Sequence, residues 1–192
     1  YEGSVVRINF SGKKITKNQF DTRWLDEVFS IGHRNPQGLI INPKNNTIWS
    51  HEHGPQGGDE INLLEGGENY GWPKVTHGEE YGGGKIGKLT QKGFKDPKWI
   101  WVPSIAPSGM AFYNGNMFPE LNDHLLIGSL KFKQIHAIKI LNGHPVLERK
   151  LLNKSYGRVR DLEVMNDGSI LFITDEDKSG RYKGGLYKIF KK

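Results

Sequence analysis

A strand–turn–strand unit that recurs three times is the feature that most constrains how this chain folds. The units begin at Gly38, Gly109 and Asp161, so their starts are 71 and 52 residues apart. Each unit opens on a small or acidic residue, runs through an apolar strand, turns on Asn or Asp beside Gly or Asn, and enters a second strand. Asn and Gly adopt positive φ at low cost, so these turns favour tight hairpins. The period predicts four-stranded blades of a β-propeller, with a long insertion in the first interval.

Short apolar runs broken by Gly, Asn, Asp and Pro make up most of the chain. Its 25 glycines in 192 residues exceed the usual share of about 7%, and such frequent turns favour an all-β fold over a helical bundle. The best helical candidate is Phe20–Phe29, which predicts one or two turns. Twelve strands are predicted, at Val5–Asn9, Gly38–Asn42, Thr47–His53, Glu60–Leu64, Trp99–Val102, Gly109–Tyr113, His124–Leu130, Ile135–Leu141, Val146–Leu152, Arg160–Met165, Ser169–Thr174 and Gly185–Phe190.

Twelve strands amount to about three four-stranded blades, whereas a closed propeller generally needs four to eight. An open arc of three blades exposes unpaired sheet faces and edges. We therefore expect residues 1–192 to be part of a single larger propeller domain. The chain also begins at Tyr1 rather than Met, with a strand almost at once, so either a leader has been removed or the chain belongs to a longer protein. The alternative fold is a compact sandwich of two sheets.

Charge and composition narrow the classes of function. The net charge of +6 comes from lysines and arginines spread along the chain, without a block of five like charges. Such a surface is either simply solvated or directed at an anionic ligand, and it lacks the stripe typical of nucleic-acid binding. Cysteine is absent, which excludes disulfide and thiolate chemistry. No apolar run reaches the roughly 18 residues of a membrane span.

Polar residues crowd into two loops, at residues 32–38 and 51–62. Pro36 fixes its own φ and disfavours helix at the residue before it, so the first loop presents its side chains on stiff backbone. His51 and His53 share a strand face, but no third ligand with zinc spacing accompanies them. The turn at residues 54–55 offers backbone carbonyls with acidic residues close behind, as a calcium site requires. From spacing alone, a plain turn is the better interpretation.

A basic cluster is predicted in the C-terminal part. Arg158 and Arg160 bracket one residue, so strand alternation places both guanidinium groups on one face. Joined by Arg34 and Lys131 from other predicted blades, they form a pocket suited to carboxylates. The alternative is surface ion pairing with nearby acidic residues. The acidic residues that could form these surface ion pairs are Glu148, Asp161 and Glu163. The acidic run 175–177 is either a solvated turn, a calcium ligand or a partner for a site arginine.

Taken together, eight motifs resemble those of the soluble aldose sugar dehydrogenases that depend on pyrroloquinoline quinone (PQQ), the glucose/sorbosone dehydrogenase family. In order they cover nearly the whole chain from residue 32. The resemblance implies a six-bladed β-propeller in the intact protein. The motifs are Gly32-His-Arg-Asn-Pro-Gln-Gly38, Glu52-His-Gly-Pro55, Asp59-Glu-Ile-Asn62, Asn69-Tyr-Gly-Trp-Pro73, Pro107-Ser-Gly-Met110, Gly128-Ser-Leu-Lys131, Arg158-Val-Arg-Asp161 and Thr174-Asp175.

The resemblance also implies a set of site residues. In the family, PQQ lies flat over the mouth of the ring, cations hold its carboxylates, and a Ca²⁺ bridges it to the protein. Carried over, Arg34 is the catalytic residue beside the reactive carbonyl, and the carbonyls of Gly54 and Pro55 ligate the calcium. His53 stands where some relatives have Gln, and Trp101 lines the sugar side. The implied cofactor-binding residues are Arg34, Asn35, His53, Lys131, Arg158, Arg160 and Asp175.

One family feature is missing from the sequence. The histidine that acts as general base lies in a His-x-Gly-Gly-like or His-Phe-Gly-like segment of the N-terminal half, and this chain contains no such segment. The resemblance thus implies the C-terminal portion of an enzyme that oxidises an aldose at C1 to the lactone. Hydride passes to PQQ and then to an external acceptor, in the periplasm or outside the cell. The fragment alone is expected to be inactive and to require the N-terminal half.

Two other functions stay open at this level. One is a non-catalytic propeller module that binds a protein or a carbohydrate. The other is a calcium-dependent lactonase-type propeller, which requires several side-chain carboxylates around a metal without PQQ. PQQ binding would distinguish the dehydrogenase from the non-catalytic module. The metal ligands would distinguish it from the lactonase-type propeller.

Overall fold

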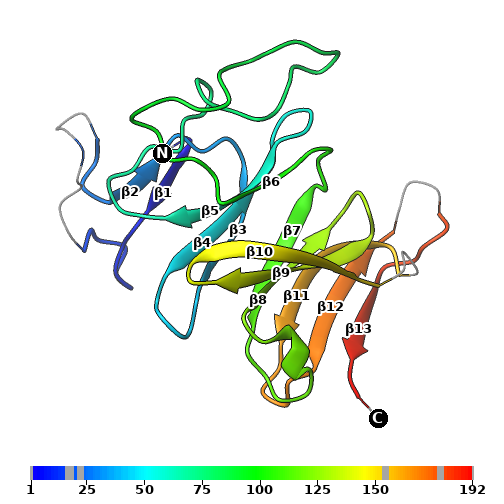
Figure 1. Cartoon of the computed structure of the whole chain (residues 1–192). Helices are drawn as coiled ribbons and strands as arrows, with labels where there is room; N and C mark the ends of the chain where they lie inside the picture. The colour runs from blue at the N-terminus through cyan, green and yellow to red at the C-terminus, as the bar shows by residue number, and fades with distance from the viewer. Residues whose placement is uncertain (1, 16–19, 21–23, 153–155, 177–179, 192) are drawn as a thin grey trace. The chain divides into compact units, whose positions relative to one another are not determined.

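The structure is a computed structural model that describes residues 2–15, 20, 24–152, 156–176 and 180–191 (Figure 1). Within these residues it contains β-strands and a single turn of 3₁₀ helix, η1, at Pro119–Leu121, and no helix is long and apolar enough to cross a membrane. The strands are β1 (Ser4–Val6), β2 (Val28–Ile31), β3 (Pro36–Ile41), β4 (Ile48–Glu52), β5 (Asp59–Leu64), β6 (Trp99–Trp101), β7 (Pro107–Tyr113), β8 (His124–Ser129), β9 (Gln134–Leu141), β10 (His144–Leu151), β11 (Arg158–Val164), β12 (Ile170–Asp175) and β13 (Gly185–Ile189).

The strands form four sheets. Their orders are β1-β2, β3-β4-β5-β6, β10-β9-β8-β7 and β11-β12-β13, so neighbours in a sheet are also neighbours in sequence. This is the meander of a propeller blade. The predicted all-β class with four-stranded blades is confirmed. The third predicted blade has three strands among the described residues, and the β1-β2 ribbon precedes the first.

Each of the twelve predicted strands overlaps an observed one, and β2 was not expected. The prediction of helical turns at Phe20–Phe29 is wrong where it meets β2, and residues 21–23 lie outside the described residues. β2 pairs with β1 in antiparallel register, with Ser30 opposite Val5. Val28 is β-branched and 4% exposed, which favours a strand in this half-buried setting.

The chain divides into two compact units, which are described separately. Unit 1 comprises Tyr1–Pro36 and Thr47–Ser104, and unit 2 comprises Gln37–Asn46 and Ile105–Lys192. In unit 1 the fully buried Trp49 and Ile61 lie on the paired strands β4 and β5. The expected long insertion is the segment 65–98 between β5 and β6, which contains bridges but no strand.

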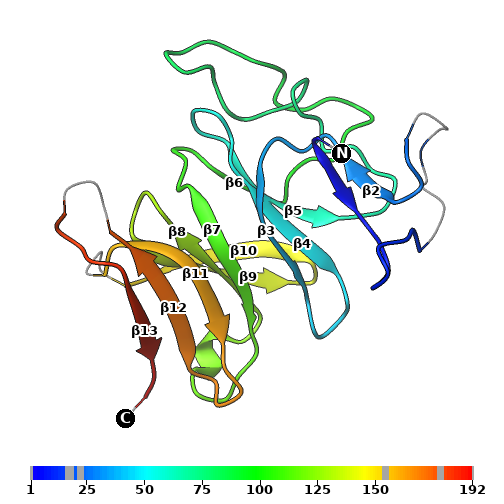
Figure 2. The same cartoon turned by 180° about the vertical axis from the view of Figure 1, so that it is seen from behind.

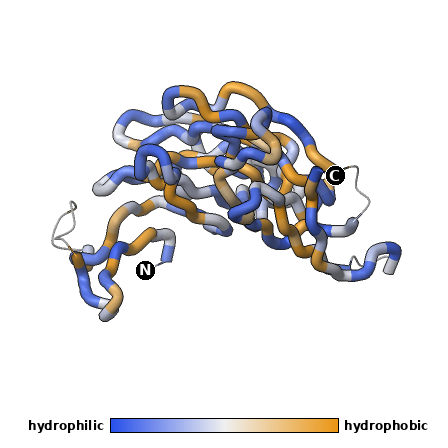
Figure 3. The backbone as a smooth tube through the Cα atoms, turned by 90° about the horizontal axis from the view of Figure 1, so that it is seen from below, coloured by the Kyte–Doolittle hydropathy of each residue, from blue (hydrophilic) through white to orange (hydrophobic). Residues whose placement is uncertain are grey.

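In unit 2, β11 lies beside β7 in both views (Figures 1 and 2). The hydroxyl of Ser108 donates to the carbonyl of Val159 at 2.6 Å, and the hydroxyl of Tyr113 donates to the carbonyl of Gly168 at 2.7 Å. All six residues of β8 are buried, as in a strand covered on both faces. Along the tube, short hydrophobic stretches are separated by hydrophilic turns (Figure 3). The two sheets of unit 2 therefore share one apolar core.

Candidate functional site

The loop that carries Arg34 follows β2 directly and is fixed by close backbone packing. The amide of Trp72 donates to the carbonyl of Gly32 at 2.9 Å. Gly32 has a φ of 76°, and a Cβ there would lie 2.6 Å from the amide nitrogen of Gly71. Only glycine accommodates both the positive φ and the close approach. The position of Arg34 is therefore set by the backbone around it.

Only part of the Arg34 guanidinium group is hydrogen-bonded. Its Nη1 donates to the carbonyls of His53 at 3.0 Å and Gly54 at 3.1 Å. Its Cζ lies 5.2 Å from the centroid of the Trp72 ring, within cation–π range. Its Nε is buried without a hydrogen-bond partner in the described part of the chain. Because a buried donor normally has an acceptor, this nitrogen fits a ligand oxygen.

The same loop meets the end of β4. The amides of Arg34 and Asn35 both donate to Oε2 of Glu52, at 2.5 and 3.2 Å. The amide of His53 donates to the carbonyl of Asn35 at 3.1 Å. The structure therefore brings together four of the residues implied by the family resemblance, namely Arg34, Asn35, His53 and Gly54.

The Gly54–Pro55 turn is fixed by a hydrogen bond to the side chain of Asp59. The amide of Gly54 donates to Oδ1 of Asp59 at 3.0 Å, and the hydroxyl of Ser104 donates to the same oxygen at 2.8 Å. Backbone carbonyls are among the oxygen donors that Ca²⁺ takes, and in this structure the Gly54 carbonyl accepts instead from the positively charged Arg34 guanidinium. In the described ranges no group of three or more His, Cys, Asp or Glu side chains could hold a metal. A calcium ion at this turn would depend largely on carbonyl oxygens.

Glu60 has an unusual protonation equilibrium. It pairs directly with Glu52 across β4 and β5. Burial raises the pKa of Glu60 to about 8, with further repulsion from Glu52 and Asp59, and the hydrogen bond from Asn62 acts in the opposite direction. A cavity of about 10 Å³ lies against Glu60, Glu52 and Arg34, room for roughly one water molecule. Negative charge is therefore disfavoured at Glu60 unless a cation lies nearby.

In unit 2 the predicted basic pair converges on one carboxylate. Arg158 donates to Asp175 through Nε at 2.9 Å and Nη2 at 2.7 Å, and Arg160 donates through Nε at 2.5 Å. The register of β11 against β12 shifts between Val159 and Asp161, so Arg160 is the extra residue of a bulge. The bulge, rather than regular alternation, directs Arg160 to Asp175.

This cluster retains an excess of positive charge. Burial raises the pKa of Asp175, but the hydrogen bonds from Arg158 and Arg160 outweigh it and lower the pKa below its usual value. Two guanidinium groups around one carboxylate leave one net positive charge for an anionic ligand. Glu148, an alternative partner considered above, instead contacts Nδ1 of His136 at 2.6 Å.

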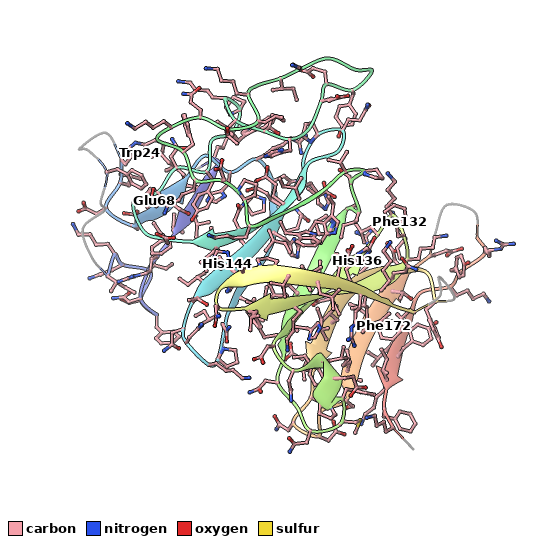
Figure 4. The ribbon with its side chains drawn as sticks, in the orientation of Figure 1. Trp24, Glu68, Phe132, His136, His144 and Phe172 are labelled. Carbon is pink, nitrogen blue, oxygen red and sulfur yellow. The ribbon has the colours of Figure 1, made fainter. Side chains whose placement is uncertain are left out.

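Of the remaining predicted residues, Trp101 lies near the Gly54–Pro55 turn, because it pairs with Asp59 and its carbonyl accepts from the Gly58 amide at 3.0 Å. The Nζ of Lys131 is 5.5 Å from the ring centroid of Phe132, in the turn between β8 and β9 (Figure 4). The amide of Lys131 donates to the carbonyl of Ile105 at 3.2 Å, and its side chain lies over Phe132 rather than at the Arg158–Asp175 cluster. Trp101, predicted to line the sugar side, is 5% exposed in β6. The end of the acidic run, Asp177, lies outside the described residues.

Sequence reasoning assigned no role to Glu52 or Trp72, although both belong to the quoted motifs, and it considered Glu60 only as one of the acidic residues behind the Gly54–Pro55 turn. Because β4 reads Ile-Trp-Ser-His-Glu, with polar residues in its second half, its pattern gives no local sign that Glu52 is buried. The pairing of Glu52 with Glu60 depends on register, and the stacking of Trp72 on Arg34 depends on a contact across 38 positions. Neither has a local sequence signal.

Comparison with known proteins agrees with the motifs. The sequence profile of the family described as Glucose / Sorbosone dehydrogenase matches residues 1–187. The aldose sugar dehydrogenase YliI of Escherichia coli (strain K12) is 40% identical over 181 residues, which cover 91% of this chain and 48% of that protein. A solved structure of a glucose dehydrogenase superposes with a TM-score of 0.90 at 36% identity, covering 99% of this chain and 55% of its own.

A third relative carries a cofactor. The PQQ-bound form of an aldose sugar dehydrogenase from Streptomyces coelicolor has a TM-score of 0.73 at 26% identity, with 97% of this chain and 51% of that chain covered. The chain thus spans about half the length of the relatives it matches. The profile match over nearly the whole sequence shows that the chain belongs to the glucose/sorbosone dehydrogenase family.

Proposed function

We propose that the intact protein oxidises an aldose at C1 to the lactone, with PQQ and Ca²⁺ as cofactors and an external electron acceptor. The observation that carries the proposal is the guanidinium of Arg34, held beside the Gly54 carbonyl with a buried Nε that has no hydrogen-bond partner among the described residues. Residues 1–192 would form the C-terminal portion of a single propeller domain and require the N-terminal half for activity. The family resemblance favours a periplasmic or secreted location.

The residues of this chain would bind and orient the cofactor. When bound, PQQ supplies the hydride acceptor and calcium supplies Lewis acidity. Arg34 would direct Nε at the quinone end, with Asn35 and His53 beside it, and Gly54 and Pro55 would hold calcium through carbonyls. The basic residues Lys131, Arg158 and Arg160 would bind carboxylates of the cofactor, with Asp175 beside them as the acceptor that holds the two arginines. Trp101 remains a prediction for the sugar side, and a histidine outside this chain would take the hydroxyl proton.

The proposal predicts sugar-dependent dye reduction by the full-length protein loaded with PQQ and Ca²⁺. Activity is expected with at least one member of an aldose panel, and it should disappear without PQQ and fall when EDTA removes the calcium. An inactive protein that still binds PQQ would leave only a binding role. A full-length protein that neither binds PQQ nor reduces the dye would contradict the proposal and favour a non-catalytic propeller module.

Removing the basic pair tests the carboxylate pocket. The double substitution Arg158→Ala with Arg160→Ala is expected to weaken PQQ binding by about 100-fold, because two charge-assisted hydrogen-bonding groups are lost. The measurement is an absorbance titration with PQQ. The matched control is Arg149→Ala with Lys150→Ala on β10, which also removes two exposed positive charges. Equal affinity in both double variants would show that only net charge matters and that the pocket is wrongly assigned.

A further inference from the structure

A buried polar network lies behind the Arg34 loop in unit 1. The hydroxyl of Ser30 contacts Nε2 of His33 at 2.9 Å, and Nδ1 of His33 contacts Oε1 of Glu52 at 3.1 Å. The side-chain amide of Asn62 donates to the same Oε1 at 3.0 Å. These four residues are between 0% and 4% exposed. The network joins β2, β4, β5 and the loop.

The order Ser30–His33–Glu52 matches that of a serine nucleophile, its base and an acid, but burial argues against this chemistry. A nucleophile must reach a substrate carbonyl, and Ser30, a residue of β2, is 0% exposed. His33 also stacks on Tyr70 at 4.7 Å between ring centroids, which holds its ring in place. The buried network is therefore suited to holding the strands and the Arg34 loop in place rather than to catalysis.

Glu52 divides its two oxygens between the network and the loop. Oε1 contacts His33 and accepts from Asn62, and Oε2 accepts from the backbone amides of Arg34 and Asn35. Glu52 also immediately precedes His53, whose carbonyl accepts from the Arg34 guanidinium. Glu52 thus fixes the backbone of Arg34 through its carboxylate. Through the chain it is also joined to His53, whose carbonyl the Arg34 side chain contacts.

We propose that Glu52 is a positioning residue, which fixes the Arg34–Asn35 backbone and thereby the Arg34 guanidinium at the Gly54 carbonyl. The inference rests on the proposed function, in which Arg34 and Asn35 contact the cofactor. Glu52 does not itself touch PQQ in this arrangement. Its effect on binding passes through the two amides that Oε2 accepts.

The substitution Glu52→Gln in the full-length protein tests this role. Glutamine keeps the shape of glutamate but replaces one acceptor oxygen by an NH₂ group. In either orientation this group faces a donor, namely the Asn62 side-chain amide or the backbone amides of Arg34 and Asn35. The expected result is at least about tenfold weaker PQQ binding, as when a buried charge-assisted bond is lost. Amide hydrogen exchange at Arg34 and Asn35 should accelerate by about tenfold or more in the absence of PQQ.

The matched control is Glu148→Gln, because Glu148 also pairs with a buried histidine, His136 (Figure 4), but lies on β10 of unit 2. It should lower thermal stability without changing exchange at Arg34 and Asn35. If Glu52→Gln fails to fold, Asn62→Ala removes one donor from Oε1 and leaves the Oε2 contacts. That variant should still accelerate exchange at both amides by a few fold.

Unchanged exchange at Arg34 and Asn35 in the folded variants would overturn the role of Glu52. Faster exchange with unaltered PQQ affinity would also overturn it, because the loop would then not control the cofactor. If the wild-type protein binds no PQQ, the proposed function fails separately. In that case the exchange measurement still decides whether Glu52 positions the loop.

Discussion

Replacing Gly32 by alanine is expected to destabilise the intact protein by about 3 to 5 kcal/mol and to abolish PQQ binding. A positive φ costs a residue with a Cβ roughly 1–3 kcal/mol, and forced overlap in a packed site costs about as much again. The new Cβ would overlap Oδ1 of Asn69 and lie 2.6 and 2.9 Å from the amide nitrogens of Gly71 and Tyr70. Backbone atoms cannot rotate away, so the loop carrying Arg34 must move. Urea unfolding and a PQQ titration measure the two effects.

Gly12 provides a matched control, because it has the same φ of 76° and nothing within 4 Å of an added Cβ. Gly12→Ala should cost only about 1 kcal/mol, from backbone strain alone, and leave PQQ binding intact. The difference between the two variants isolates the close approach at Gly32. Equal losses of stability would show that backbone strain, and not packing around the loop, makes glycine necessary there.

Glu60 should make the intact protein less stable as the pH rises from about 4.5 to about 8. In this window the unfolded chain has released the proton while the folded chain keeps it, because the folded pKa is raised to about 8 from 4.5. The unfolded state binds fewer protons, so the free energy of unfolding falls with pH. After allowance for partial solvent exposure, the loss is roughly 2 to 4 kcal/mol.

Glu60→Gln should flatten this dependence, because glutamine resembles the protonated acid and cannot ionise. The variant is expected to match the wild type near pH 5 and to exceed its stability near pH 8 in calcium-free buffer. Urea unfolding at intervals of half a pH unit measures the curves. Glu163→Gln, at an exposed position of β11, serves as the control and should follow the wild type. Parallel curves for wild type and Glu60→Gln would contradict a raised pKa.

Most of the fold was accessible from sequence because strands and tight turns are local. The Asn- and Gly-rich turns predicted the hairpins, and each expected strand appears. The missed strand β2 shows the limit. Its pairing partner, β1, lies more than twenty residues earlier, and the segment 67–70, which also hydrogen-bonds to Phe29 and Ile31, lies more than thirty residues later. Tertiary pairing there overrides the weak helical pattern.

The candidate site was accessible in part. The motifs identified Arg34, Gly54 and Arg158 as site residues, because a motif specifies which residue types follow one another along the chain. They did not reveal that Arg34 already donates to the Gly54 carbonyl, or that Glu52 accepts from the Arg34 amide. Both contacts depend on the distance between separate strands and loops. Such distances follow from packing and have no signature in local sequence.

The bulge in β11 also has a consequence for how charge is counted at this edge of the sheet. In a regular ladder that keeps Arg158 opposite Asp175, Arg160 would lie opposite Ile173, which carries no charge. The inserted residue gives Arg160 no partner of its own, so it shares Asp175 with Arg158. One backbone irregularity thus brings two guanidinium groups to a single carboxylate, which balances the charge of only one of them.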